Sequence, residues 1–314
     1  MKSAVRMTLS TLFAGAVLAG AATGTVAQGG GVVAQGTTAS GWSQFISVSP
    51  AIQGKTDLKD GGGDFSAQSV YLRAGASRAM GDGGNRVGIT LNYDYTNFDF
   101  SDKTVFGKAP WGIVQRVGVS VPMTFRGSDG WSYGVAPSID YFKENGADWG
   151  ESMSYGALFT ASKAFAADRR IGFGLGAFER LEKTSFFPLL LVDWRFNERW
   201  RLINPLPSGP TGPAGLELDY RLSSDWSAGL GASYRTQRFR LSKDGAVANG
   251  IGAERGAPVF LRLTHRVGQQ STVFLYAGAI FGGKLRLEDS NGNELREVKF
   301  DPQPIIGATF LLRL

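Results

Sequence analysis

The chain has 314 residues, 44 of them glycine, no cysteine and a formal net charge of +6. The lack of cysteine excludes disulfide frameworks, thiolate metal sites and a lipid-modified N-terminal cysteine. The positive excess is modest and spread along the sequence, so it does not predict a nucleic-acid partner.

The N-terminus has the pattern of an export signal. Lys2 and Arg6 precede an apolar stretch over residues 7–19, and small residues follow. This order is typical of a secretory signal peptide, and the small residues at 25–27 suit cleavage there. We therefore predict that residues 1–27 are a signal peptide, with an earlier cut as the alternative.

Residues 28–41 are rich in Gly, Thr, Ala and Ser. This composition predicts a flexible N-terminal segment, which either stays in the periplasm or enters the interior of the following domain as a small plug. After the signal peptide we find no run of 18 or more apolar residues, so a membrane crossing would need strands and not helices.

From residue 42 onward, apolar and polar residues alternate over long stretches. Between 131 and 141 the odd-numbered positions are Trp, Tyr, Val, Pro, Ile and Tyr, while the even-numbered positions are Ser, Gly, Ala, Ser and Asp. The stretches 86–99 and 151–165 alternate in the same way. They are long for ordinary strands of about 5–6 residues. A strand of a membrane barrel needs one face for lipid and one for the interior, which this pattern provides.

The spacing of such segments predicts about 14 strands, with 12 as the alternative because prolines interrupt the region around residues 186–206. In chain order the predicted strands are 42–53, 65–79, 86–99, 111–126, 131–142, 151–165, 171–181, 186–196, 200–206, 214–222, 226–241, 256–266, 271–287 and 297–314. Short turns alternate with longer or more polar connections, although the connection at 182–185 is short. Such alternation is typical of antiparallel up-and-down transmembrane barrels whose short turns are periplasmic. We thus expect one all-β domain, a β-barrel over residues 42–314, with both termini periplasmic.

Three short turns are each followed by a tryptophan at the start of the next strand. These residues are Trp131, Trp200 and Trp226. Because an indole favours the boundary between hydrocarbon and headgroups, we predict that they form a periplasmic girdle. The alternative is that they are core residues of a water-soluble β-protein.

The last strand resembles the C-terminal signature of outer-membrane β-barrel proteins. Ile306, Ala308, Phe310, Leu312 and Leu314 share one parity, although members of that class usually end in Phe. The resemblance implies insertion by the barrel insertion machinery, contact with outer-membrane lipid and lipopolysaccharide, and location in the outer membrane of a Gram-negative bacterium. Residues 42–314 as a whole resemble uncharacterised outer-membrane barrel families, which implies an architecture and no activity.

We predict no catalytic, cofactor or metal site, and no enzyme. The single histidine, His265, shares the parity of apolar neighbours near a short turn, where a structural role is favoured over that of a general base. The acidic segments 57–64 and 289–294 resemble calcium-binding loops in part. The first is a single copy of a Gly-Asp pattern that binds calcium only as stacked repeats, and the second has Glu294 at the sixth position, where Gly is required. We therefore predict that both are connections.

The inward parities of the predicted strands carry charged residues of both signs. We predict that these residues line the lumen: Arg73, Asp94, Arg116, Asp140, Arg180, Asp193, Arg195, Glu217, Asp219, Arg221, Arg235 and Arg262. Two interpretations stay open. They pair across the interior as a structural network, or they form a water-filled ring that filters solutes by charge.

The leading functional hypothesis is a narrow channel or transporter for small solutes. Many inward positions are glycine, and about 14 strands enclose more space than side chains fill in an 8-stranded barrel but less than a large porin. One alternative is a non-conducting structural or adhesion barrel that presents loops such as 54–64, 206–214 and 242–254. The other, less favoured, is a lipid-modifying enzyme that depends on His265.

Overall fold

The structure is a computed structural model, and it describes residues 41–59, 62–81, 84–101, 103–104, 106–107, 109–204, 211–212 and 214–314. The predicted signal peptide and nearly all of the predicted flexible segment lie outside these residues. Within them, no helix is long and apolar enough to cross a membrane.

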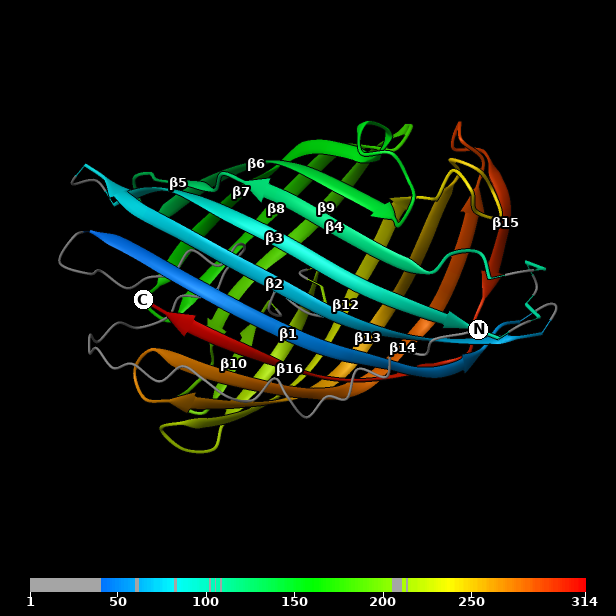
Figure 1. The fold of residues 1–314 in the computed structure, drawn as a ribbon. Helices are drawn as coiled ribbons and strands as arrows, with labels where there is room; N and C mark the ends of the chain where they lie inside the picture. Colours follow the sequence, from blue (N-terminus) through cyan, green and yellow to red (C-terminus); the bar gives the residue numbers. More distant parts are fainter. Residues whose placement is uncertain are drawn as a thin grey trace.

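Sixteen strands form one sheet that closes on itself (Figure 1). They are β1 Trp42–Asp57, β2 Asp64–Met80, β3 Asn85–Phe100, β4 Ile113–Ser120, β5 Met123–Arg126, β6 Trp131–Glu144, β7 Met153–Ala166, β8 Arg169–Arg180, β9 Lys183–Arg195, β10 Trp200–Ile203, β11 Ala214–Arg221, β12 Trp226–Arg240, β13 Ile251–Val267, β14 Ser271–Glu288, β15 Glu294–Lys299 and β16 Gln303–Arg313. Closure is made by antiparallel pairing of β1 with β16. Every neighbouring pair in the wall is antiparallel, so the predicted all-β barrel is confirmed.

Two pairs of strands each fill one position in the wall, so the described residues form a barrel of 14 strands. Between β3 and β6, one strand is interrupted at Val121 and Pro122, which separate β4 from β5. Proline has no N–H to donate to the hydrogen-bond ladder of the sheet. Between β14 and β1, β15 and β16 are separated by residues 300–302. The predicted number of strands is therefore confirmed, while the predicted strands 111–126 and 297–314 are each broken once.

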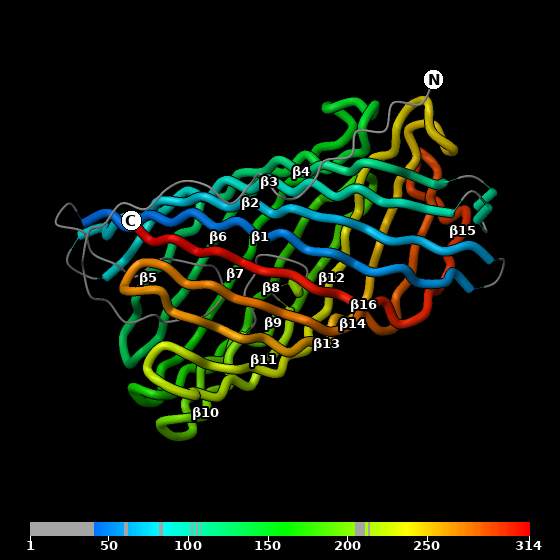
Figure 2. Tube along the Cα trace, turned by 60° about the horizontal axis from the view of Figure 1, so that its bottom comes forward, coloured from blue at the N-terminus to red at the C-terminus, as the bar shows by residue number. Residues whose placement is uncertain are grey.

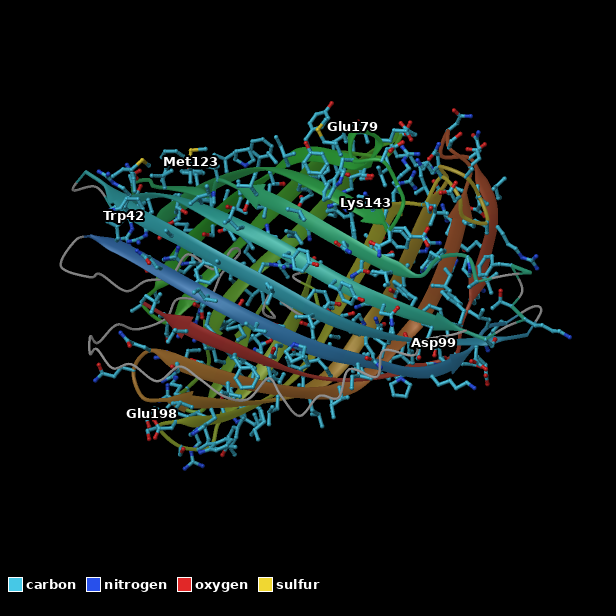
Figure 3. The ribbon with its side chains drawn as sticks, viewed as in Figure 1. Trp42, Asp99, Met123, Lys143, Glu179 and Glu198 are labelled. Atoms are coloured by element: carbon cyan, nitrogen blue, oxygen red, sulfur yellow. The ribbon has the colours of Figure 1, made fainter. Side chains whose placement is uncertain are left out.

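The connections differ at the two ends of the barrel. The turns after β2, β5, β7, β9, β11 and β13 are short and define the short-turn end; the opposite end is the loop end. The N–H of Gln44 donates to the carbonyl of Leu314 at 3.3 Å, so β1 begins and the chain finishes at the short-turn end. Figure 3 places Trp42 and Glu198 at this end and Asp99 at the other.

The outward face of the wall is strongly apolar. Large exposed side chains recur at every second position, among them Ile46, Leu91, Phe159, Phe173 and Leu261. Water-soluble monomers rarely expose a continuous apolar surface of more than a few hundred Å². An apolar band around a closed barrel is instead the surface that a bilayer requires.

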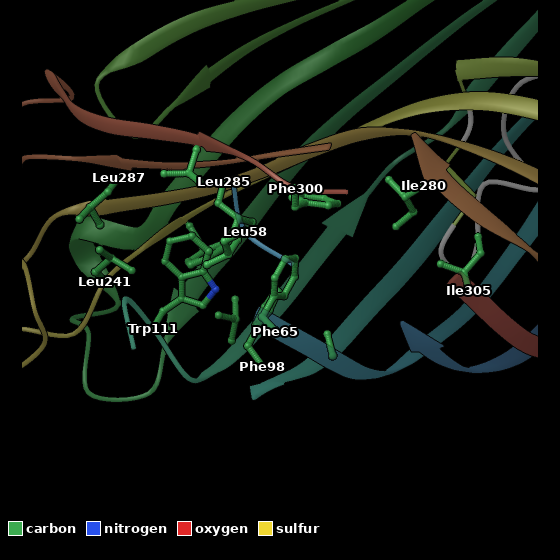
Figure 4. Packing of buried hydrophobic residues seen from close by; sticks show 14 residues of the cluster. Leu58, Phe65, Phe98, Trp111, Leu241, Ile280, Leu285, Leu287, Phe300 and Ile305 are labelled. Atoms are coloured by element: carbon green, nitrogen blue, oxygen red, sulfur yellow. The ribbon is translucent and has the colours of Figure 1, made fainter. Parts of the chain in front are cut away.

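The interior at the loop end is filled by an apolar cluster, which we call the loop-end core (Figure 4). Its buried members are Leu58, Phe65, Ala67, Phe98, Trp111, Val114, Phe239, Leu241, Ile280, Leu285, Leu287, Val298, Phe300 and Ile305.

Strands that are not neighbours in the wall meet within this core. The ring centroid of Phe239 on β12 lies 5.2 Å from that of Trp111 and 6.4 Å from that of Phe98. Near this contact, Arg240 of β12 forms a parallel bridge with Lys143 of β6. The loop end is therefore narrowed by contacts that run from one side of the barrel to the other.

Candidate functional site

A cavity of about 430 Å³ lies inside the barrel. Its lining comes from many strands and has two kinds of surface. Arg73, Arg116, Arg180 and Arg235 contribute cationic groups, whereas rings such as Phe187 contribute apolar surface. Asp94 is the acidic group in the lining. The cavity therefore suits a small molecule and is more cationic than anionic.

A ladder of alternating charge crosses β2, β3, β4 and β6 on the lumen side. Arg73 pairs with Asp94, which also lies 3.5 Å from Nη1 of Arg116. Nη2 of Arg116 lies 2.8 Å from Oδ1 of Asp140. The register produces this order because Asp94 lies directly opposite Arg116 in the ladder between β3 and β4. Four of the predicted lumen residues are thus brought together as one network.

Arg180 on β8 also lines the cavity, but it does not take part in the ion pairs of this ladder. Its guanidinium lies 4.7 Å from the ring centroid of Phe178 and 4.6 Å from that of Phe187. Two faces of aromatic rings stabilise a cation through their quadrupoles. Among the described residues no carboxylate forms an ion pair with Arg180. Arg180 is therefore a cation of the cavity lining that is stabilised by two aromatic rings.

Arg235 on β12 links its strand to β1 across the interior of the barrel. Its Nη2 lies 2.9 Å from Oε1 of Gln53 on β1 and 2.5 Å from Oε1 of Glu254 on β13. All three side chains are buried. The contact with Gln53 spans the interior, because β1 and β12 are not neighbours in the wall.

Glu217 and Arg262 form a separate buried pair. Nη2 of Arg262 lies 2.6 Å from Oε1 of Glu217, and the Glu217 side chain is fully buried. The Arg262 guanidinium also lies 5.3 Å from the ring centroid of Phe274, a cavity residue. This pair supports the wall beside the cavity.

The remaining predicted lumen residues lie toward the short-turn end and outside the cavity lining. Asp193 accepts two hydrogen bonds from Arg201, at 2.7 and 2.8 Å, and Asp219 accepts one from the Ser227 hydroxyl at 2.8 Å. Arg195 and Arg221 end their strands and are exposed. These four do not join the ladder. The part they play in lining a solute path stays a prediction.

The sequence interpretation did not include a second charged cluster at the loop end. Glu297 on β15 contacts Arg255, Lys284 and Arg286 at 2.5–2.6 Å. Burial favours the neutral acid, but the hydrogen bonds from Lys284 and Arg286 outweigh it and lower the pKa of Glu297 to about 2. Opposite charges at alternate positions of one hairpin were the available signal for this cluster.

The three tryptophans of the predicted girdle lie at the short-turn end. Trp200 and Trp226 are exposed, and Trp131 is stacked on Tyr133 with centroids 5.9 Å apart. His265 stacks on Trp226 at 4.1 Å. The histidine therefore belongs to this aromatic rim and lies away from the cavity. Contact of the rim with headgroups stays a prediction.

Within the described residues, no group of three or more His, Asp or Glu side chains is placed to hold a metal ion. The arginines of the cavity offer hydrogen bonds and positive charge, which suit a carboxylate or another anion.

No family model matches the chain, and no curated protein matches it. The solved structures that match include outer-membrane channels. One is an outer membrane channel from Pseudomonas putida F1, with 8% identity, a TM-score of 0.49 and coverage of 95% of this chain and 100% of that one. The Pseudomonas putida toluene transporter TodX has 8% identity, a TM-score of 0.42 and coverage of 88% and 90%.

A third match, LpxR from Salmonella typhimurium, has 8% identity, a TM-score of 0.36 and coverage of 86% and 99%. At these identities and scores the likeness does not extend to substrate or activity. By its own geometry the chain belongs to the architectural class of closed, membrane-type β-barrels.

Proposed function

We propose that this protein is an outer-membrane barrel that carries small solutes through its interior. The observation that supports this most directly is the central cavity, which is lined by arginines and apolar side chains inside a wall with an apolar outer face. Because hydrocarbon surrounds the wall, a polar space within it provides an environment for solutes that lipid excludes. The short-turn end then faces the periplasm.

The loop-end core limits the kind of transport that we expect. Among the described residues, apolar rings meet across the barrel at that point and narrow the passage along the axis. Hydrophobic constrictions also oppose ion flow, because water leaves them readily. The proposed activity is therefore selective uptake of small molecules with low ionic conductance.

Uptake by proteoliposomes tests this proposal. The mature chain is reconstituted, and entry of small radiolabelled carboxylates, amino acids and sugars is measured. We expect uptake of some of these probes above that of protein-free vesicles. No uptake of any probe by a correctly folded barrel would refute the proposal and favour a structural or adhesion barrel.

A matched pair of variants tests whether the cavity carries the solute. Ala136 lines the cavity from β6, while Ala157 lies on the outward parity of the neighbouring strand β7. We expect Ala136→Trp to reduce uptake at least fivefold and Ala157→Trp to leave it unchanged. Equal uptake by both variants would show that solutes do not use this cavity.

A further inference from the structure

Eight strands each carry an inward-facing arginine at the short-turn end, and we call these residues the arginine ring. Three of them are the second residue of a strand that begins at this end: Arg86, Arg170 and Arg201. The other five are the last or second-last residue of a strand that finishes there: Arg126, Arg195, Arg221, Arg266 and Arg313. In Figure 2, β5 and the C-terminus, which follows β16, lie at one end of the barrel, and β15 lies at the other. The ring therefore borders the mouth of the lumen at the short-turn end.

The register of the strands places the arginine ring on the lumen face. Arg86 shares the parity of Asn92, and Arg313 shares that of Leu311, and both of these neighbours line the cavity. The same comparison places the other six arginines on this face. Each of them shares the parity of a cavity residue or lies opposite a residue that does.

The other six strands of the wall present hydroxyl groups on the same face near this end. These residues are Ser43, Ser77, Ser132, Ser162, Ser227 and Thr272. A hydroxyl accepts a hydrogen bond from a guanidinium but carries no charge to neutralise it. The mouth therefore combines positive charge with neutral hydrogen-bonding groups.

Most of the charge of the arginine ring is not compensated by carboxylates. Arg86 and Arg170 donate to serine hydroxyls on nearby strands at 3.0 and 3.1 Å. Asp193 and Asp219 are the carboxylates that the described strands present on this face near the mouth. In the described part of the chain, Arg201 alone of the ring forms an ion pair, with Asp193 at 2.7 Å. The mouth therefore keeps a clear excess of positive charge.

The arginine ring lies next to the central cavity. Leu311 and Phe274 line the cavity, and each is the next residue of the same face after Arg313 and Thr272 respectively. The lining of the cavity is itself more cationic than anionic, as described above. A solute that passes between the mouth and the cavity therefore meets positive charge at both places.

This arrangement favours solutes of high negative charge. A low-dielectric wall concentrates the field of charges that lie on its inner face. The Coulomb energy of a solute in that field is proportional to its own charge, so a dianion is attracted more strongly than a monoanion and a cation is repelled. The guanidinium also binds carboxylates through paired hydrogen bonds. Rings of arginine or lysine select anions in pores for these reasons.

We propose that the arginine ring selects small organic dianions, of which dicarboxylates are the simplest, as the solutes that this barrel carries. This inference rests on the proposed transport function and names its substrate class. It also assigns a role to Arg195 and Arg221, which lie outside the cavity lining but belong to the ring.

Exchange of a charge series across proteoliposomes tests the substrate class. Succinate, succinamate, succinamide and 1,4-diaminobutane have similar four-carbon skeletons and carry charges from two negative to two positive. Each vesicle is preloaded with the unlabelled form of the probe, so that exchange of the labelled form moves no net charge. We expect the rate to fall in this order, with succinate about tenfold faster than the diamine, because the field at the mouth acts on the charge of the solute.

A matched pair of triple variants tests whether the arginine ring causes this order. Arg86, Arg170 and Arg313 belong to the ring, and glutamine at these positions keeps a donor for the neighbouring hydroxyls.

The control removes three charges from the outer face at the same end. Arg78, Lys163 and Arg169 lie over the rings of tryptophans there. We expect the ring triple, R86Q with R170Q and R313Q, to slow succinate about fivefold and succinamide much less, because the field at the mouth is weakened. The control triple, R78Q with K163Q and R169Q, should change neither rate.

The outcomes separate the two proposals. If all four probes exchange at equal rates, or if both triples slow succinate equally, selection by the arginine ring is refuted and the transport function stands. Equal slowing of succinate and succinamide by the ring triple would show that the ring shapes the mouth without selecting charge. If a correctly folded barrel exchanges no probe faster than protein-free vesicles, the transport function and the inference are both refuted.

Discussion

The buried carboxylates of the lumen wall lie against glycines. A Cβ atom on Gly229 would overlap the Glu217 carboxylate, and one on Gly118 would overlap that of Asp140. The absence of a side chain on the neighbouring strand lets each carboxylate lie flat on the wall and reach its arginine. These glycines are thus spacers for ion pairs, in addition to leaving room in the lumen.

At the residue scale, the Glu217–Arg262 pair gives a double-mutant prediction. Removing one partner of a buried pair leaves an uncompensated charge, so Glu217→Leu should lower the free energy of unfolding by about 3–5 kcal/mol. Adding Arg262→Leu should recover most of this loss. Urea unfolding in phospholipid vesicles measures both values; a double variant that is as unstable as the sum of the singles would contradict the pairing.

A second residue-scale prediction concerns pH. The folded pKa of Glu297, about 2, lies below the ordinary value of 4.5, so its contribution to stability is complete above pH 4.5 and is lost as the pH falls through about 2. The loop-end hairpin of β14 and β15 should therefore keep its ion pairs at pH 3–4. Carboxyl chemical shifts of labelled glutamate measure the midpoint, and Arg286→Gln should raise it. A midpoint near 4.5 in the unaltered chain would contradict the observed contacts.

At the element scale, Asn204 joins β9 to the start of β11 just beyond the end of β10. Asn204→Ala leaves two carbonyls and the N–H of Val192 without this partner, which should cost about 1–3 kcal/mol. Faster hydrogen exchange at Val192 is the expected result. Asn204→Asp, which keeps the acceptor but loses the donors, should protect that amide better than alanine does; equal exchange in all three chains would exclude the bridge.

The strands themselves could be predicted because their signals are local. Alternation and turn residues set both ends of β6 to within two residues, and the two-residue connection Leu181–Glu182 fits the short segment expected near 182–185. The break at Pro122 was missed because the apolar alternation continues through it. The end of β10 at Ile203 was also missed. The side chain of Asn204 bonds there to backbone groups of the neighbouring strands β9 and β11, and the alternation of residues does not reveal such bonds.

At the scale of the whole molecule, the pairing of charges could not be read from the sequence. Which groups an arginine meets depends on the register of every strand and on how the sheet closes. The contact of Arg235 with Gln53 across the interior illustrates this. The loop-end core was missed for the same reason. Phe98 and Phe239 follow the inward parity near strand ends, and only the closed barrel shows that they meet.

The central claim is that a closed barrel presents its apolar outer face to lipid and its polar parity to the interior. Spin labels on neighbouring residues of the cysteine-free chain test it in reconstituted bilayers, with Ile139→Cys, Leu230→Cys and Leu261→Cys on the outer face and Ser138→Cys on the inner face. We predict that the three outer labels collide often with oxygen and rarely with a water-soluble nickel complex. The label at Ser138→Cys should collide more often with the nickel complex than with oxygen. Free access of the nickel complex to the outer labels would contradict a membrane-spanning barrel.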